Sequence, residues 1–138
     1  MLTAALGYSG RGWLVLPLHS IQTDGDCTCG KSDCTSPGKH PRTTNGLKDA
    51  STDADQINCW WRRWPDANVG IATGAGSGIV VIDLDGNEGG QNFLTLVHQH
   101  RCAIETLLSR TGGGGYHWFF SHPGRAIKKQ YLEAWSEH

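Results

Sequence analysis

Two aspartates, Asp83 and Asp85, follow the apolar segment IVVI and are separated by one residue. In an extended chain, residues two apart point to the same side of the backbone. Carboxylates placed in this way repel each other, and a bound cation removes that cost. Oxygen ligands at a strand end suit Mg²⁺ or Mn²⁺, especially an ion that is also held by substrate phosphates. The alternative is that DLDGN is merely a turn after a strand.

Two other sites that begin with Asp-x-Asp can be compared with this segment by their spacing. An EF-hand loop starting at Asp83 requires Gly where Glu88 stands and Glu where Leu94 stands, so the spacing excludes it. A phosphohydrolase with Asp83 as its nucleophile also begins with an apolar strand. That class normally has Thr at the position of Asn87 and paired aspartates later, whereas no Asp follows Asp85. It stays a weaker alternative.

Four consecutive glycines at positions 112–115 precede the aromatic segment YHWFF, which contains His117. Glycines allow positive φ and leave backbone N–H groups open to an anion. We expect a hairpin with His117 on the outgoing strand and its aromatic neighbours on the opposite face. Near an acidic pair, such a histidine could contact a triphosphate; the alternative is a flexible hairpin with a structural histidine. The candidate phosphate-binding residues of this segment are Arg110, Thr111, Gly113 and Gly114.

Three of the five cysteines and a histidine are crowded into one polar loop, at residues 19–47. Cys27, Cys29, Cys34 and His40 offer three thiols and an imidazole, which fits a closed tetrahedral zinc site. Metal binding would also explain how so long a loop stays ordered. The alternatives are an unmetallated loop, or a fourth ligand other than His40, with His19, Asp26 and Asp33 as candidates. Cys59, on an expected helix, and Cys102, near a helix end, are expected to be ordinary buried or half-buried residues.

Basic residues follow the cysteine loop and recur in a Trp-rich segment. Lys39 and Arg42 could contact phosphates or fill an ordinary surface role. Arg62 and Arg63 stand beside three tryptophans and could contact phosphates or bases. For that segment the favoured interpretation is that the Trp side chains pack on the core and the Arg side chains are solvated.

The chain pattern predicts a mixed α+β domain. We expect helices at 2–11, 55–64 with Asp53 as the N-cap, and 88–101. Strands are expected at 13–18, 69–73, 79–83, 106–111 and 116–120. The third of these, IVVID, is apolar on both faces and is therefore predicted to be a central strand.

Length and composition limit the class of protein. The 138 residues suffice for one domain with one core. With 38% hydrophobic and 18% charged residues, the chain is globular rather than disordered. No apolar run approaches the ~20 residues of a membrane span, and the N-terminus has no cationic signal-peptide start. A formal net charge of -1 argues against a generally basic nucleic-acid coat. The crowded thiols suit a reducing compartment, so a cytoplasmic location is expected.

Several segments in order resemble one known family. They are AALGYSGRGWLVLPLHS, SPGKHPRTTNGLKDAST, WWRRWPDANVGIATGAGSGIVVIDLD and SRTGGGGYHWFF. Together they are similar to the bifunctional DNA primase/polymerase N-terminal (prim-pol) domain of the archaeo-eukaryotic primase superfamily, found in replication proteins of plasmids, phages and other mobile elements. The resemblance covers roughly residues 3–129.

The resemblance implies an α+β catalytic core with an RRM-like mixed or antiparallel sheet, flanking helices and a Cys-rich zinc-loop insertion. It implies template-directed nucleotidyl transfer from nucleoside triphosphates on single-stranded DNA, with a replicative helicase as a further partner. Asp83 and Asp85 match the family's first metal-binding motif, and His117 matches the histidine that contacts the nucleotide's phosphates. The zinc-loop pattern of many members matches Cys27, Cys29, Cys34 and His40.

One departure concerns the C-terminus. The family carries a third acidic motif after the histidine motif, and the tail QYLEAWSEH does not match it, although it contains Glu133 and Glu137. A missing metal-ligating carboxylate costs on the order of a thousandfold in rate or more. We therefore expect a C-terminally incomplete domain that polymerises poorly. A non-catalytic zinc-containing fragment that binds nucleotide or single-stranded DNA is the alternative.

Overall fold

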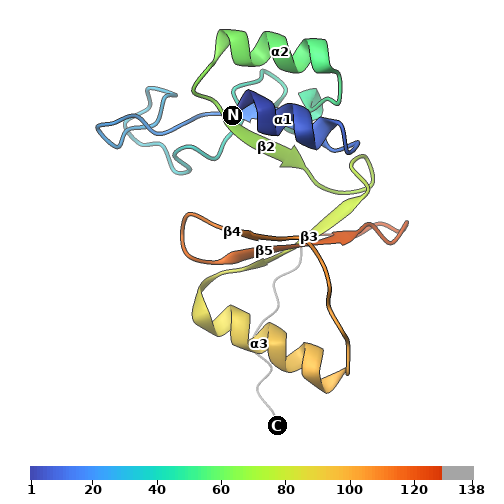
Figure 1. Cartoon of the computed structure of the whole chain (residues 1–138). Helices are drawn as coiled ribbons and strands as arrows, with labels where there is room; N and C mark the ends of the chain where they lie inside the picture. The colour runs from blue at the N-terminus through green and yellow to red at the C-terminus, as the bar shows by residue number, and fades with distance from the viewer. Residues whose placement is uncertain (129–138) are drawn as a thin grey trace. The chain divides into compact units, whose positions relative to one another are not determined.

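The computed structural model describes residues 1–128, except for the side chain of Asn87. The C-terminal tail with Glu133 and Glu137 lies outside the described residues. The chain divides into two compact units, one from Met1 to Gly78 and one beginning at Ile79 (Figure 1). Each unit has its own antiparallel sheet. The described fold is mixed α+β, as predicted.

The first unit contains helix α1 (Leu2–Ser9), strand β1 (Leu14–Leu18), the short 3-10 helix η1 (Gly46–Asp49), helix α2 (Ala54–Arg63) and strand β2 (Asn68–Ala72). The two strands pair antiparallel, with Leu14 opposite Ala72 and Leu18 opposite Asn68. Both α-helices pack on a core that contains Ala5, Val15, Ile57, Trp61 and Ala67.

Helix α2 forms where its end signals predicted. The Asp53 side chain caps it by accepting a hydrogen bond of 2.9 Å from the Asp55 amide, and Pro65 follows its last turn. Trp61 is buried, and its indole N–H donates to the carbonyl of Ala67 at 3.2 Å. That bond satisfies the ring's polar atom inside the core.

The second unit contains strand β3 (Ile79–Leu84), helix α3 (Gly86–Gln99), strand β4 (Leu108–Arg110) and strand β5 (Tyr116–Ser121). Its sheet has the order β3-β5-β4, with antiparallel pairing throughout. Among the described residues, β5 is therefore the central strand and β3 lies at an edge. The expectation that IVVID is central was wrong, because its apolar composition reports burial and not the number of strands that pair with it.

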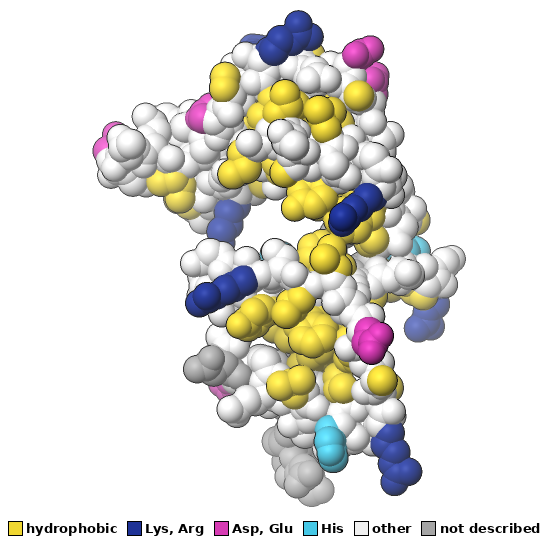
Figure 2. All heavy atoms as spheres, viewed as in Figure 1, with side chains coloured by type: hydrophobic (Ala, Val, Ile, Leu, Met, Phe, Trp, Pro, Cys, Tyr) yellow, Lys and Arg dark blue, Asp and Glu magenta, His cyan; other side chains and the backbone are white. Residues whose placement is uncertain are grey.

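Helix α3 covers one face of this sheet. Phe93 is buried, and its ring meets Trp118 of β5 edge-on, with 5.2 Å between the ring centroids. In Figure 2, apolar side chains gather between the sheet and the helix. Side chains alternate along a strand, so the residues next to Trp118 in β5 project from the face that α3 does not cover.

Candidate functional site

Asp83 and His117 stand directly opposite each other on β3 and β5. His117 Nε2 lies 3.3 Å from Asp83 Oδ1. The Asp83 side chain is 58% exposed and the His117 side chain is 40% exposed, so a ligand can reach both. Because His117 adjoins Trp118, the pair projects from the sheet face opposite α3. The structure thus brings together a predicted carboxylate and the predicted histidine.

Asp85 occupies the N-cap position of α3, two residues after Asp83, with φ -85° and ψ 129°. The backbone is therefore still extended at this residue, in keeping with the expectation that the carboxylates share one side. Its side chain makes no capping hydrogen bond to the helix and is exposed. Among the described residues, the one group of three or more metal-ligating side chains that lie close together is in the first unit and does not include Asp85, so the structure does not bring Asp85 into one ligand set with Asp83 and His117.

The candidate phosphate-binding residues of the glycine loop are not all on this face. Arg110 pairs with Tyr116 in the sheet, one position away from His117, so its side chain projects from the α3 side. The structure does not bring Arg110 together with Asp83 and His117. In the loop, the Gly114 amide donates to the Thr111 carbonyl at 3.1 Å. The amide of Gly113 has no hydrogen bond to any described residue and is exposed.

Thr111 and Gly115 close the glycine loop. The Thr111 amide donates to the Gly115 carbonyl, and the Gly115 amide donates to Thr111 Oγ1, each at 2.9 Å. A Cβ atom on Gly115 would collide with the carbonyl oxygen of Leu84 at the end of β3. Glycine at this position therefore lets the hairpin approach the strand that carries Asp83.

The first unit holds the predicted thiol and imidazole cluster. The ligand atoms of Cys27, Cys29, Cys34 and His40 all lie within 4.8 Å of one another. His40 Nε2 is 3.4 Å from Cys27 Sγ and 3.5 Å from Cys34 Sγ. With Zn–S about 2.3 Å and Zn–N about 2.0 Å, ligand atoms of a tetrahedral site stand about 3.5 Å apart. This cluster could hold a zinc ion.

The local electrostatics favour a thiolate at one of these ligands. The backbone amide of Gly38 and the imidazole of His40 lower the pKa of the Cys27 thiol to about 6, against the effect of burial. The amide of Ser36 acts in the same direction on Cys34, but burial and the neighbouring thiols outweigh it and raise the pKa of Cys34. One negative charge is therefore favoured first at Cys27, and further thiols ionise more readily beside a cation.

His40, rather than His19, supplies the imidazole of this cluster. His19 Nδ1 instead contacts Thr28 Oγ1 at 3.0 Å, and its ring lies against that of His40 with 4.4 Å between centroids. Burial is the main cause that lowers the pKa of His19, followed by His40 and Arg42. The structure places His19 beside the cluster as a packing partner.

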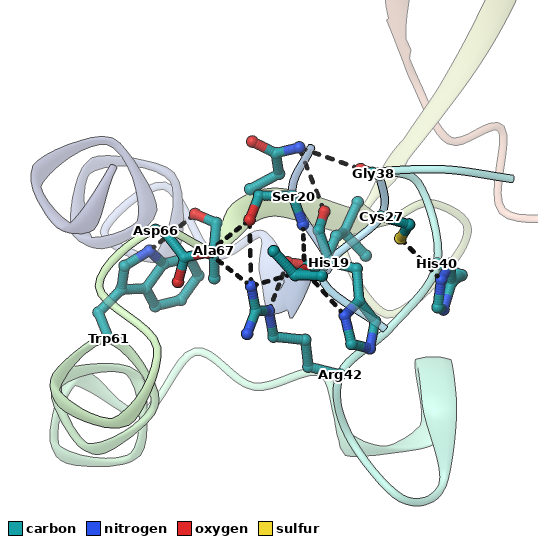
Figure 3. Close-up of polar contacts among 12 residues, drawn as sticks. His19, Ser20, Cys27, Gly38, His40, Arg42, Trp61, Asp66 and Ala67 are labelled. Carbon is teal, nitrogen blue, oxygen red and sulfur yellow. Dashed lines mark hydrogen bonds and ion pairs between the residues drawn. The ribbon is translucent and has the colours of Figure 1, made fainter. Parts of the chain in front are cut away.

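Arg42 makes an internal network (Figure 3). Its side chain is only 8% exposed and lies 2.9 Å from the Asp66 carboxylate. The same Nη2 donates to Ser20 Oγ at 3.1 Å and Thr28 Oγ1 at 2.9 Å, and Nε donates to the Leu18 carbonyl at 3.2 Å. The guanidinium thus ties the zinc-type loop to the turn after α2. Lys39, by contrast, is exposed.

Sequence reasoning missed Asp66, Ser20 and Thr28, which position the loop. Ser20 Oγ donates to Asp66 at 2.6 Å, and this bond and Arg42 lower the pKa of the carboxyl group. These residues are far apart in the chain and match no motif. The available signal was indirect: a polar loop rich in Ser, Thr and Asp must satisfy its buried groups internally.

The comparison with protein families decides the relationship of the chain. The family model for the bifunctional DNA primase/polymerase, N-terminal domain (Prim-Pol) matches residues 5–134. The chain belongs to the Prim-Pol family. No curated protein and no solved structure matches it. Prim-Pol membership confirms the resemblance drawn from the sequence motifs and supports a role with nucleotides and DNA. Within residues 1–128, no helix is long and apolar enough to cross a membrane.

Proposed function

We propose that this Prim-Pol chain binds a nucleoside triphosphate with Mg²⁺ or Mn²⁺ at Asp83, Asp85 and His117 and transfers the nucleotide to a primer on a single-stranded DNA template. The observation that carries the proposal is the 3.3 Å contact between Asp83 and His117 on an open sheet face. It unites a metal-binding group with a phosphate-binding group in one exposed place.

In nucleotidyl transfer, the 3′ oxygen of the growing strand forms a bond to the α-phosphorus. The bond from that phosphorus to its bridging oxygen breaks, pyrophosphate leaves, and the hydroxyl proton passes to solvent. Asp83 and Asp85 would hold the divalent ions, which lower the pKa of the 3′ hydroxyl and neutralise charge on the phosphates. His117 would orient the triphosphate by donating a hydrogen bond to a phosphate oxygen. The exposed Gly113 amide would be a further donor.

The Cys27, Cys29, Cys34 and His40 cluster is proposed to bind one structural zinc ion. A Cys3His site with no open position suits a structural role. Lys39 of this loop is exposed and can reach a phosphate, whereas Arg42 is engaged by acceptors of the protein itself. A replicative helicase is the further partner that family membership favours.

The test is incorporation of labelled nucleotide on primed single-stranded DNA in the presence of Mn²⁺ or Mg²⁺. Asp83→Ala should abolish incorporation. The matched control is Glu88→Gln, which removes one charge from an exposed side chain in the first turn of α3. Incorporation that survives Asp83→Ala would overturn the assignment of the site. Metal-dependent nucleotide binding without turnover would favour the non-catalytic alternative, and release of phosphate from small phosphomonoesters would favour the phosphohydrolase.

A further inference from the structure

A pocket of about 280 Å³ lies between helix α2 and the segment that follows His40, the last residue of the Cys3His cluster. Its lining includes Thr44, Gln56, Cys59, Trp60, Arg63 and Trp64. All of these belong to the first unit, whereas Asp83 and His117 belong to the second. The volume is close to the lower end of the about 300–1,000 Å³ of small-molecule sites. It therefore suits one planar ring better than a whole nucleotide.

One wall of the pocket combines an aromatic ring with a cation. The Arg63 guanidinium lies over the Trp64 ring, 4.9 Å from its centroid. Trp64 is half-buried against the core of the unit, so the ring is held in place, while Arg63 is exposed. A nucleobase can stack on an aromatic ring or on a guanidinium plane. This wall offers a guanidinium backed by an aromatic ring.

The charges around the pocket discriminate between ligands. Arg42 also contacts Trp64, but its charge is offset by Asp66. Arg63 has no carboxylate within 4.0 Å in the described part of the chain. Asp49 lies on the lining as well, and hydrogen bonds from Asn45 lower the pKa of its carboxyl group. A compact polyphosphate would meet this negative group, whereas a strand with one phosphate per base can place that phosphate at Arg63 alone.

We propose that this pocket is a subsite for single-stranded nucleic acid, in which one base lies against the Arg63 and Trp64 stack. Arg63 neutralises the phosphate next to that base. The subsite concerns strand binding and goes beyond the proposed nucleotidyl transfer, since it needs neither nucleotide nor divalent metal.

The test is a fluorescence anisotropy titration of the full chain with a labelled oligodeoxythymidine of about twelve nucleotides, without nucleotide or Mg²⁺. Arg63→Ala should raise the Kd about fivefold or more. The matched control is Arg62→Ala, which removes the same charge from an exposed neighbour on α2 outside the pocket lining and should change the Kd by less than about twofold. Thermal unfolding followed by circular dichroism verifies that both variants are folded.

Two further experiments distinguish binding in the pocket from attraction by positive charge alone. Cys59→Trp fills the pocket from an exposed helix position and should weaken binding as Arg63→Ala does. An abasic strand of equal length should bind wild type more weakly and should show a smaller difference between wild type and Arg63→Ala, because only the phosphate contact of Arg63 remains. The proposal would be overturned if Arg62→Ala and Arg63→Ala weakened binding equally, or if Cys59→Trp left binding unchanged. It would also be overturned if a mononucleotide at equal concentration displaced the strand, or if the wild-type protein did not bind the strand. If the strand binds with the expected effects of the variants but no nucleotide is incorporated, the result supports the subsite and contradicts only the proposed nucleotidyl transfer.

Discussion

Arg42 and Asp66 form an ion pair of 2.9 Å that joins the end of the zinc-type loop to the turn after α2. The two residues are far apart in the sequence, and one partner is buried while the carboxylate is 57% exposed. The pair is also hydrogen-bonded to Ser20 and Thr28. It therefore anchors a loop that has little apolar surface of its own to the core of the first unit.

Removal of this anchor should destabilise the first unit. Arg42→Met deletes the guanidinium that donates to Asp66, Ser20 and Thr28. It also deletes the donor that serves the Leu18 carbonyl. We expect the free energy of unfolding to fall by about 2 kcal/mol, measured by urea denaturation. Arg11→Met is the matched control, because Arg11 is exposed and lies over the Trp13 ring without such a network. A loss for Arg42→Met no larger than the control would contradict the anchoring role.

The same carboxylate should make stability depend on pH in the acid range. The hydrogen bond from Ser20 and the charge of Arg42 hold the pKa of Asp66 below its usual value of 3.8. A group with a lowered folded-state pKa contributes stability that is fully present above the unfolded value and is lost as pH falls through the folded one. Stability should therefore decline as pH drops below about 4. Asp66→Asn should be less stable at neutral pH and show a smaller decline, measured by urea titrations at each pH. An equal decline in both proteins would refute the linkage.

Metal content gives a direct measurement at the Cys3His cluster. The purified chain is expected to carry one zinc per molecule by elemental analysis, and Cys34→Ser should lose most of it. Because metal binding energy orders the loop, a strong chelator should lower the midpoint of thermal unfolding. Cys59→Ser changes an exposed thiol outside the cluster and should retain the zinc. Zinc loss from both variants alike, or its retention in Cys34→Ser, would argue against this ligand set.

Substitutions at two glycines of the second unit, Gly115 and Gly113, distinguish the effect of close packing from that of loop flexibility. Gly115→Ala places a Cβ against the Leu84 carbonyl, a backbone atom that cannot turn away. We expect this substitution to cost about 1–3 kcal/mol in the free energy of unfolding. In Gly113→Ala, in the same loop, the added Cβ meets nothing within 4 Å. This substitution should cost at least about 1 kcal/mol less than Gly115→Ala. Similar losses at the two positions would show that the approach to Leu84 does not limit the hairpin.

Local signals in the sequence predicted much of the fold. The N-cap Asp53 and Pro65 define α2, and the expected strands appear with shifts of one or two residues at most ends. The order of the strands was not predictable in the same way. Strand β3 reads as apolar on both faces, yet its place at an edge depends on pairing with β5, which lies more than thirty residues later.

The candidate site shows the same division between local and distant information. Spacing alone indicated that Cys27, Cys29, Cys34 and His40 form a cluster. Spacing could not place Arg110, because a shift of one residue in register moves a side chain to the other face of a sheet. Nor could it distinguish a phosphate-binding arginine from the internal role of Arg42, since the acceptors that surround the guanidinium come from distant segments.

The part of the polar loop that holds the Cys3His cluster, residues 19–40, begins and ends at neighbouring points of the fold. His19 donates its amide hydrogen to the carbonyl of His40 at 2.9 Å, and Leu18 forms a bridge with Pro41. The intervening twenty residues thus leave the fold and return to the same place, where the Arg42 amide donates to the carbonyl of Pro17 in β1 at 3.0 Å. Such an arrangement allows the loop to be lengthened, shortened or exchanged during evolution without a change in the strand beneath it.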